Sequence, residues 1–91
     1  MQGEGASVGM LYDEKGEHAI ARLSYRLERR VALDGFEQVT GEYTLLEEFS
    51  PVHTGLAQLI PADGERLLVR VTRITRPSDE GEFEVIGPPE G

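Results

Sequence analysis

The sequence predicts a small all-β domain, and three observations support that prediction. Apolar and polar residues alternate along most of the longer segments, as they do in strands with one buried face. Turn signals such as Asp34-Gly35 and Asp63-Gly64 separate those segments. The length, 91 residues, suits one domain with a modest core. We therefore expect five or six antiparallel strands with meander connections, forming either a small barrel or a compact sandwich.

The first expected strand covers residues 8–12 and ends at a turn over residues 13–16. Residues 18–31 fit either a strand or an amphipathic helix, because their apolar residues also lie near helical spacing. A helix would place Tyr25 off its apolar stripe and would lack clear caps at both ends. Alternation keeps Tyr25 with the other apolar residues, so a long strand is the favoured interpretation.

Asp34-Gly35 predicts a tight turn into a second alternating strand, which ends at Ser50-Pro51. A three-residue loop over residues 34–36 pairs Tyr25 with Leu45 and keeps the apolar residues of both strands on one face. Leu27 and Val31 are expected on that same buried face. A two-residue loop would instead set apolar residues opposite polar ones, and a slip of one residue moves a hydrophobic face into water. The favoured register also places Arg22 opposite Glu48.

Three further segments complete the expected sheet. Residues 56–60 form a short apolar run, although a helical turn within residues 53–60 is the alternative and would make the fold α+β. Residues 67–75 are rich in Val, Thr and Ile, and Ile74 falls out of phase, which predicts a bulge near Thr72-Arg73. Phe83 and Val85 are the inward residues of the last strand.

The composition predicts one soluble domain, residues 1–91, with an ordered core of about residues 8–86 and flexible tails at 1–7 and 87–91. The chain contains no cysteine, no apolar segment near the roughly 18 residues of a membrane span, and no signal-peptide pattern. We therefore expect a cytoplasmic protein with no membrane partner. The net charge of −8 disfavours nucleic acid as a partner.

Arginines and glutamates are expected on different strands. Arginines gather within residues 22–30 and 66–76, whereas glutamates gather within the predicted partner strands, residues 42–48 and 82–84. Cross-strand ion pairs, worth about 0.2–1 kcal/mol each, explain most of this pattern. An anion site is the alternative, because arginine binds phosphate and carboxylate in a bidentate manner. The candidate anion-binding residues are Arg26, Arg29, Arg30, Arg70 and Arg76; among them Arg29, Arg30 and Arg76 have no predicted partner.

The segment Ser50-Pro51-Val52-His53-Thr54-Gly55 is the candidate functional loop, since Ser50, His53 and Thr54 bring two hydroxyls and an imidazole together. Nucleophilic catalysis needs the serine within hydrogen-bond reach of an oriented base, and no Gly-x-Ser-x-Gly elbow or phosphate-binding glycine loop occurs. A turn stabilised by Ser and Thr side chains is the expected role. The two histidines have no metal-ligand spacing, so no catalytic residue, metal or cofactor is predicted.

Arg26-x3-Arg30, followed by Glu48-x-Ser50 and Gly55-Leu56, resembles the PilZ domain, and the resemblance covers about a third of the chain. It implies a six-stranded barrel that binds cyclic di-GMP. The family has its Arg-x3-Arg in an N-terminal linker, whereas these arginines lie inside a predicted strand. Gly55 also comes two residues later than the family pattern requires.

The leading functional prediction is a non-catalytic interaction module that binds a protein partner or itself. Small β-domains with exposed edges recruit partners by strand addition, and oligomerisation would support so small a core. The alternative is an anion-binding barrel whose strand arginines take a phosphorylated small molecule, a cyclic nucleotide or an oligonucleotide. An enzyme with His53 as its base is the third reading, and no catalytic motif favours it.

Overall fold

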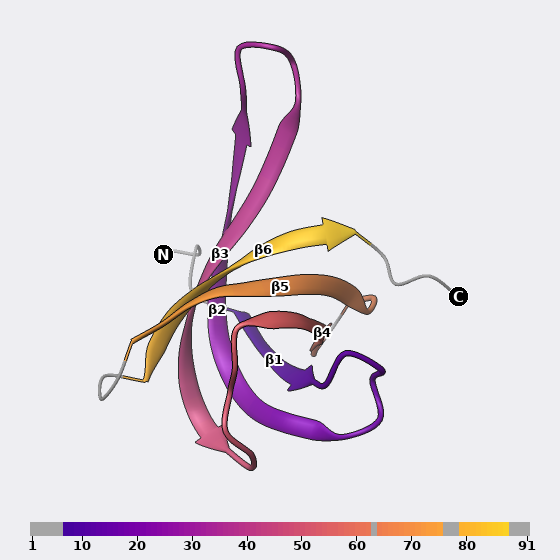
Figure 1. Cartoon of the computed structure of the whole chain (residues 1–91), viewed down its shortest axis with the longest axis vertical. Helices are drawn as coiled ribbons and strands as arrows, with labels where there is room; N and C mark the ends of the chain where they lie inside the picture. Colours follow the sequence, from indigo (N-terminus) through magenta and orange to yellow (C-terminus); the bar gives the residue numbers. More distant parts are fainter. Residues whose placement is uncertain (1–6, 63, 76–78, 88–91) are drawn as a thin grey trace.

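The computed structural model describes residues 7–62, 64–75 and 79–87, which form a closed antiparallel barrel (Figure 1). Its strands are β1 (Ser7–Tyr12), β2 (Ala19–Val31), β3 (Glu37–Glu48), β4 (Gly55–Pro61), β5 (Leu67–Thr75) and β6 (Glu80–Gly87). The prediction of a small all-β barrel is confirmed, and the helical alternatives are wrong because those segments form β2 and β4. Within the described ranges no helix could span a membrane. Ser7 and Gly87, predicted in the tails, belong to strands, and the rest of those tails lies outside the described residues.

The strands close around the barrel in the order β1-β2-β3-β6-β5-β4. Strands β1 to β3 form one meander and β4 to β6 form a second, so the meander prediction is right within each half. It is wrong between β3 and β4, which are not neighbours, because β4 pairs with β1 and β3 pairs with β6. Residues 49–54 connect β3 to β4. Because these two strands are not neighbours in the barrel, the connection is longer than a tight hairpin turn.

The core is built from the inward face of each strand. On β2 the predicted alternation holds for Ala21, Leu23 and Tyr25, all of which are buried. Leu23, Leu59 and Val69 are the largest fully buried side chains. The register of β5 shifts between Val71 and Arg73, which confirms the predicted bulge and allows Ile74 to pack against the core.

Strands β3 and β6 meet in a glycine–aromatic seam formed by residues 41–43 and 81–83. Gly41 lies opposite Phe83, and Tyr43 lies opposite Gly81. A Cβ at Gly41 would overlap the Phe83 ring, and one at Gly81 would overlap the Tyr43 ring. The missing side chains therefore make room for the rings, whose centroids lie 6.3 Å apart. Tyr25 adds an edge contact to Phe83 at 6.2 Å, which completes a buried aromatic cluster.

The β2–β3 hairpin has a different register from the predicted one. Tyr25 lies opposite Tyr43 rather than Leu45, and Arg22 lies opposite Glu47 rather than Glu48. The reason is the turn, since the Ala32 N–H donates to the Phe36 carbonyl (2.8 Å) and leaves residues 33–35 as the three-residue loop. Gly35 has a φ of +90°, the left-handed conformation typical of such a loop. The shift is two residues at Tyr25, so the predicted faces are kept there. It is one residue at Arg22, because the register changes between Arg22 and Leu23.

The distal part of this hairpin, residues 26–38, projects beyond the barrel, and we call it the arm (Figure 1). Pairing of β1 with β2 ends at Tyr25, and pairing of β6 with β3 begins at Val39. Leu27 and Val31 were predicted on the buried face, and that prediction is wrong because the barrel ends before they are reached. They are 44% and 69% exposed.

The turn between β1 and β2 is fixed by Asp13. Its Oδ1 accepts hydrogen bonds from the backbone N–H groups of Glu17 (2.8 Å) and His18 (3.3 Å). Gly16 follows with a φ of +75°, and its N–H donates to the Asp13 carbonyl. The hydrogen bond from the Glu17 N–H is the main reason that the pKa of Asp13 lies below its usual value of 3.8.

We expect G41A to lower the free energy of unfolding by about 1–3 kcal/mol, because the new Cβ displaces the Phe83 ring. Urea unfolding followed by circular dichroism measures the change. G64A is the matched control, since its Cβ would lie 3.4 Å from the nearest atom. That variant should stay within about 0.5 kcal/mol of wild type. G41A of wild-type stability would show that the seam does not need its glycine.

Asp13 also predicts a pH dependence. Its pKa is lowered in the folded state, so its contribution is complete above the unfolded pKa and is lost as the pH falls through the folded pKa. D13N keeps an acceptor oxygen but cannot titrate. The stability difference between wild type and D13N should therefore shrink between about pH 7 and about pH 3, as measured by thermal unfolding. A difference that stays constant over this range would contradict the assignment.

Candidate functional site

The two arginine-rich strands, β2 and β5, do not lie side by side, because the glutamate-rich strands β3 and β6 separate them. The registers align one row across all four strands. Arg26 lies opposite Glu42, Glu42 opposite Glu82, and Glu82 opposite Arg73. Charges on this outer face therefore run positive, negative, negative, positive. The segregation seen in the sequence becomes a charge-balanced ladder.

Ion pairs connect most of the arginines of the described chain to a glutamate. They join Arg22 to Glu47 (3.8 Å), Arg29 to Glu37 (2.9 Å), Arg30 to Glu28 (3.3 Å), Arg70 to Glu84 (3.0 Å) and Arg73 to Glu82 (3.1 Å). The expectation that Arg29 and Arg30 lack partners is wrong, because Glu37 lies across the hairpin and Glu28 two residues along β2. All five pairs are solvent-exposed, so each is worth less than about 1 kcal/mol.

The candidate anion-binding residues are not brought together as one cationic cluster. Arg29, Arg30 and Arg70 are ion-paired, and Arg76 lies outside the described residues. Arg26 forms no ion pair with another described residue. The predicted pair of Arg22 with Glu48 is replaced by Arg22 with Glu47, since the register shifts between Arg22 and Leu23.

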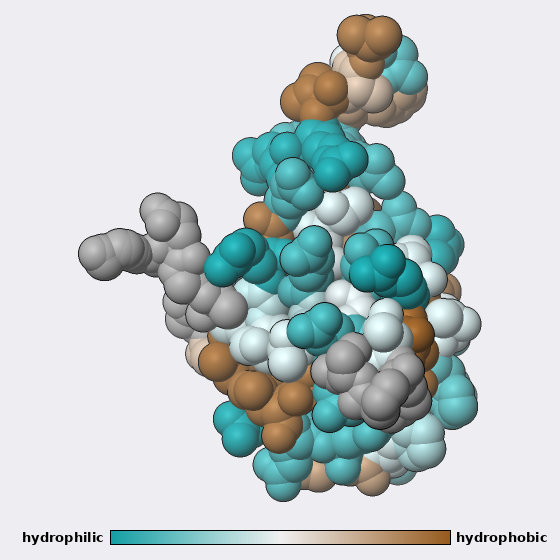
Figure 2. All heavy atoms as spheres, turned by 90° about the vertical axis from the view of Figure 1, so that its left-hand side faces the viewer, coloured by the Kyte–Doolittle hydropathy of each residue, from teal (hydrophilic) through white to brown (hydrophobic). Residues whose placement is uncertain are grey.

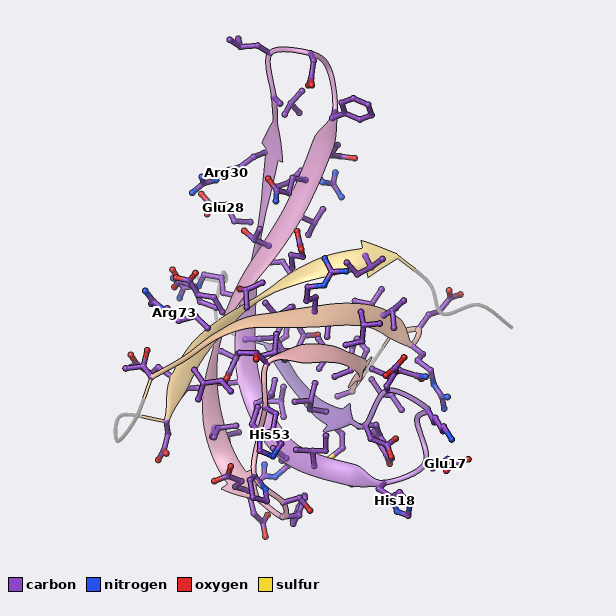
Figure 3. The ribbon with its side chains drawn as sticks, viewed as in Figure 1. Glu17, His18, Glu28, Arg30, His53 and Arg73 are labelled. Carbon is purple, nitrogen blue, oxygen red and sulfur yellow. The ribbon has the colours of Figure 1, made fainter. Side chains whose placement is uncertain are left out.

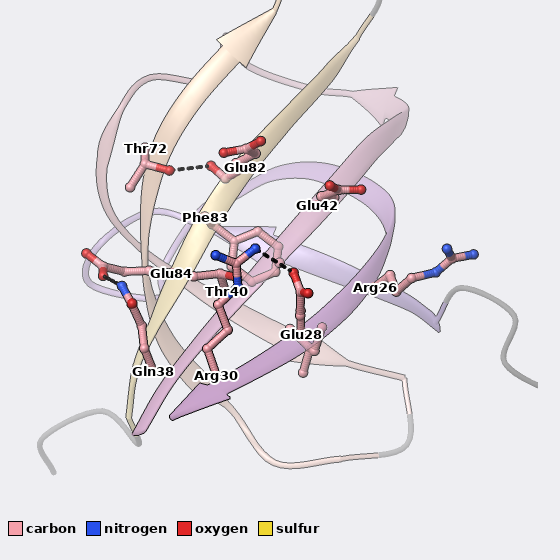
Figure 4. A pocket seen from close by; sticks show the side chains of 12 residues that line it. Arg26, Glu28, Arg30, Gln38, Thr40, Glu42, Thr72, Glu82, Phe83 and Glu84 are labelled. Atoms are coloured by element: carbon pink, nitrogen blue, oxygen red, sulfur yellow. Dashed lines mark hydrogen bonds and ion pairs between the residues drawn. The ribbon is translucent and has the colours of Figure 1, made fainter. Parts of the chain in front are cut away.

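A groove of about 600 Å³ lies where the arm leaves the barrel (Figure 4). Its charged lining consists of Arg26, Arg30, Glu28, Glu42, Glu82 and Glu84. Two arginines and four glutamates give a net of two negative charges, so an anion in this groove would meet repulsion. Hydrogen bonds already use part of the lining, including Gln38 Nε2 to Glu84 Oε2 at 3.3 Å and Thr72 Oγ1 to the Glu82 carbonyl at 3.2 Å.

The candidate functional loop is held at the opposite end of the barrel from the arm. Figure 3 shows His53 at one end of the molecule and Arg30 at the other. The Phe49 and Ser50 N–H groups donate to the Ile20 carbonyl, and the Val52 N–H donates to Glu48 Oε2 at 3.1 Å. Val52 is buried in the core.

Ser50, His53 and Thr54 are exposed on this loop. Among the described residues, no hydrogen bond joins their side chains to one another, and no group of three His, Asp or Glu residues could hold a metal. The loop geometry accounts for a structural connection between the two halves of the barrel. An enzyme with His53 as its base stays an alternative interpretation, separate from the expected role of a stabilised turn.

The feature that the sequence analysis missed is the apolar surface of the arm. Val31 and Phe36 are 69% and 75% exposed, and Leu33 at the tip is fully exposed. Figure 2 shows hydrophobic residues at the tip of the arm, above a hydrophilic band. One sequence signal was available: the two long alternating strands exceed every other predicted strand in length. Where two paired strands extend beyond the strands on either side of them, the rest of the sheet cannot cover their side chains.

We expect V52A to lower the free energy of unfolding by about 1–2 kcal/mol, because two buried methyl groups are removed from the loop anchor. H53A should change it by less than about 0.5 kcal/mol, since the imidazole is exposed. Thermal or urea unfolding of both variants measures this contrast. A larger loss for H53A than for V52A would show that the imidazole has a structural role.

Comparison with family models, with curated proteins and with solved structures gives no match to this chain. The PilZ resemblance therefore rests on the spacing of a few residues. The structure places Arg26 and Arg30 within the arm, at the opposite end of the barrel from the loop that follows Glu48 (Figures 1 and 3).

Proposed function

We propose that this protein is a non-catalytic interaction module that assembles with copies of itself through the arm. The observation that carries the proposal is the exposure of Leu27, Val31, Leu33 and Phe36 on one projecting hairpin. Single exposed apolar residues are common on protein surfaces, but here four of them gather within residues 27–36 of one hairpin. Leu27 and Val31 share one face, whereas Leu33 and Phe36 lie at the tip, and exposed apolar surface of this kind is typical of an interaction site. Burial of this group would stabilise an assembly by about 25 cal/mol for each Å² of apolar surface removed from water.

Charge also favours the arm as the contact. Within residues 26–38, three arginines (26, 29 and 30) balance Glu28, Asp34 and Glu37, so the arm has no net charge. The rest of the chain therefore carries the whole net charge of −8. Two copies that approach barrel to barrel would repel each other, whereas two arms would not. A second copy therefore meets less repulsion at the arm than at the rest of the chain taken together.

The isolated arm has little to stabilise it. Two-stranded hairpins are marginal in water, and a third strand or another packed surface is needed for independent stability. Association would supply that surface. The exposed, separate side chains of Ser50 and His53 support the non-catalytic part of the proposal. The lack of cysteine fits a reducing compartment, so the proposal includes a cytoplasmic location.

The test is sedimentation velocity over protein concentrations from about 10 μM to about 1 mM. We expect the wild-type protein to self-associate. A shortened arm, in which Asn-Gly replaces residues 31–37, keeps the Arg30–Gln38 pair and supplies a tight turn. This variant should fold and should associate at least about tenfold more weakly.

L46S is the matched control, because Leu46 is an exposed leucine on β3 outside the arm, at 46% exposure. It should associate like wild type. A wild-type protein that stays monomeric at about 1 mM would overturn the proposed function. So would a shortened-arm variant that associates as well as wild type.

A further inference from the structure

In the described part of the chain, the β2 side of the arm has no neighbouring strand except β3. No other described strand pairs with β2 beyond Tyr25, where its pairing with β1 ends. Residues 26–31 of β2 therefore pair with β3 on one side, and no described residue pairs with them on the other. An unpaired edge of this kind is a template for another strand, and strand addition across it would give main-chain hydrogen bonds.

The turn shows which backbone groups face this edge. The Ala32 N–H donates to the Phe36 carbonyl, so Ala32 directs its backbone groups toward β3. Successive residues of an antiparallel strand alternate in this direction, and the register of the arm has no shift after Leu23. The N–H and C=O groups of Leu27, Arg29 and Val31 therefore point outward from the free edge.

Resting on the proposed function, we infer that this edge pairs antiparallel with the same edge of a second copy, about a twofold axis at Arg29. In this arrangement Leu27 of each copy lies opposite Val31 of the other, and Arg29 lies opposite Arg29. The three pairs use the outward backbone groups of all three residues. Each pair of this kind exchanges two hydrogen bonds.

Side-chain complementarity selects this register. On one face two Leu27–Val31 pairs bring exposed apolar side chains together. On the other face Glu28 of each copy lies opposite Arg30 of its mate, which gives two pairs of opposite charge. Arg29 meets its own copy on the axis, but Glu37 lies 2.9 Å from its guanidinium and offsets the repulsion.

The neighbouring registers are worse. A twofold axis normal to the sheet keeps opposite residues on the same face. The nearest alternative registers are therefore those in which the axis moves by one residue along β2, to Glu28 or to Arg30. An axis at Glu28 sets Glu28 against Glu28 and Arg26 against Arg30. An axis at Arg30 sets Arg30 against Arg30 and Arg29 against Val31. Each of these two registers loses the Glu28–Arg30 pairs and the Leu27–Val31 pairs. Each also leaves one of the three outward-facing residues of the arm without a partner among the same three residues of the second copy.

Single-cysteine trapping tests the register directly, because the chain has no cysteine of its own. In the inferred dimer the Cα atoms of the two residues 29 lie about 5.5 Å apart, within disulfide range. Residues 28 and 30 lie more than about 7 Å from their own copies, because a two-residue offset along the strands separates them. In a glutathione redox buffer, R29C should form disulfide dimers at least about tenfold faster than E28C or R30C.

Charge reversal gives an independent measurement. E28R and R30E each replace an opposite-charge pair with a like-charge pair, so each should weaken self-association measured by sedimentation. The double variant E28R/R30E restores both the pair between copies and the Glu28–Arg30 contact within β2, so it should recover association. Additive losses in the double variant would overturn the inferred pairing.

The outcomes separate this inference from the proposed function. Self-association that depends on the arm, with faster trapping of E28C or R30C than of R29C, would overturn the register and leave the function standing. Residues 1–6, which precede β1 in the chain, are the rival occupant of the edge. R29C trapping should be unchanged when residues 1–6 are deleted. Trapping that appears only after this deletion would assign the edge to the chain's own N-terminal segment and overturn the inference.

Discussion

The contact between the Phe83 ring and Gly41 holds β3 against β6, and the architecture depends on that pairing. The reciprocal contact of Tyr43 with Gly81 fixes the same two strands in register. This seam joins the two meanders on one side of the barrel, opposite the junction of β1 with β4. It also decides where the arm begins, because β6 supports β3 only as far as Val39. The packing of the aromatic rings against the glycines of β3 and β6 thus fixes the strand pairing beyond which the arm projects.

The same alternation of side chains that builds the core builds the charge ladder. Inward positions of β3 and β6 carry the seam, and the intervening outward positions carry Glu42 and Glu82. Arg26 and Arg73 flank these glutamates on the outer strands. The result is an outer face with exposed, balanced charge and a groove that is slightly negative. Such a face offers little to an anion. The exposed apolar side chains of the arm differ from it in chemistry.

Local features of the sequence predicted the strands, their faces, the bulge at Thr72-Arg73 and the pairing of arginines with glutamates in general. The register of β2 with β3 was wrong by two residues, because a shift of two keeps every side chain on its face and the hydrophobic pattern cannot detect it. The β3–β6 pairing was missed because it joins segments that are distant in the chain. The exposure of Leu27 and Val31 was missed for a related reason, since burial depends on how far the neighbouring strands extend.

The length of the arm has a consequence for how this protein can change over evolutionary time. Insertion or deletion of two residues in each strand of the arm lengthens or shortens it and preserves which face Leu27 and Val31 occupy. A change of one residue would carry those apolar side chains to the side now held by Glu28 and Arg30. Variation in the arm is therefore expected in even steps, and each step would change the length of the arm by about 7 Å.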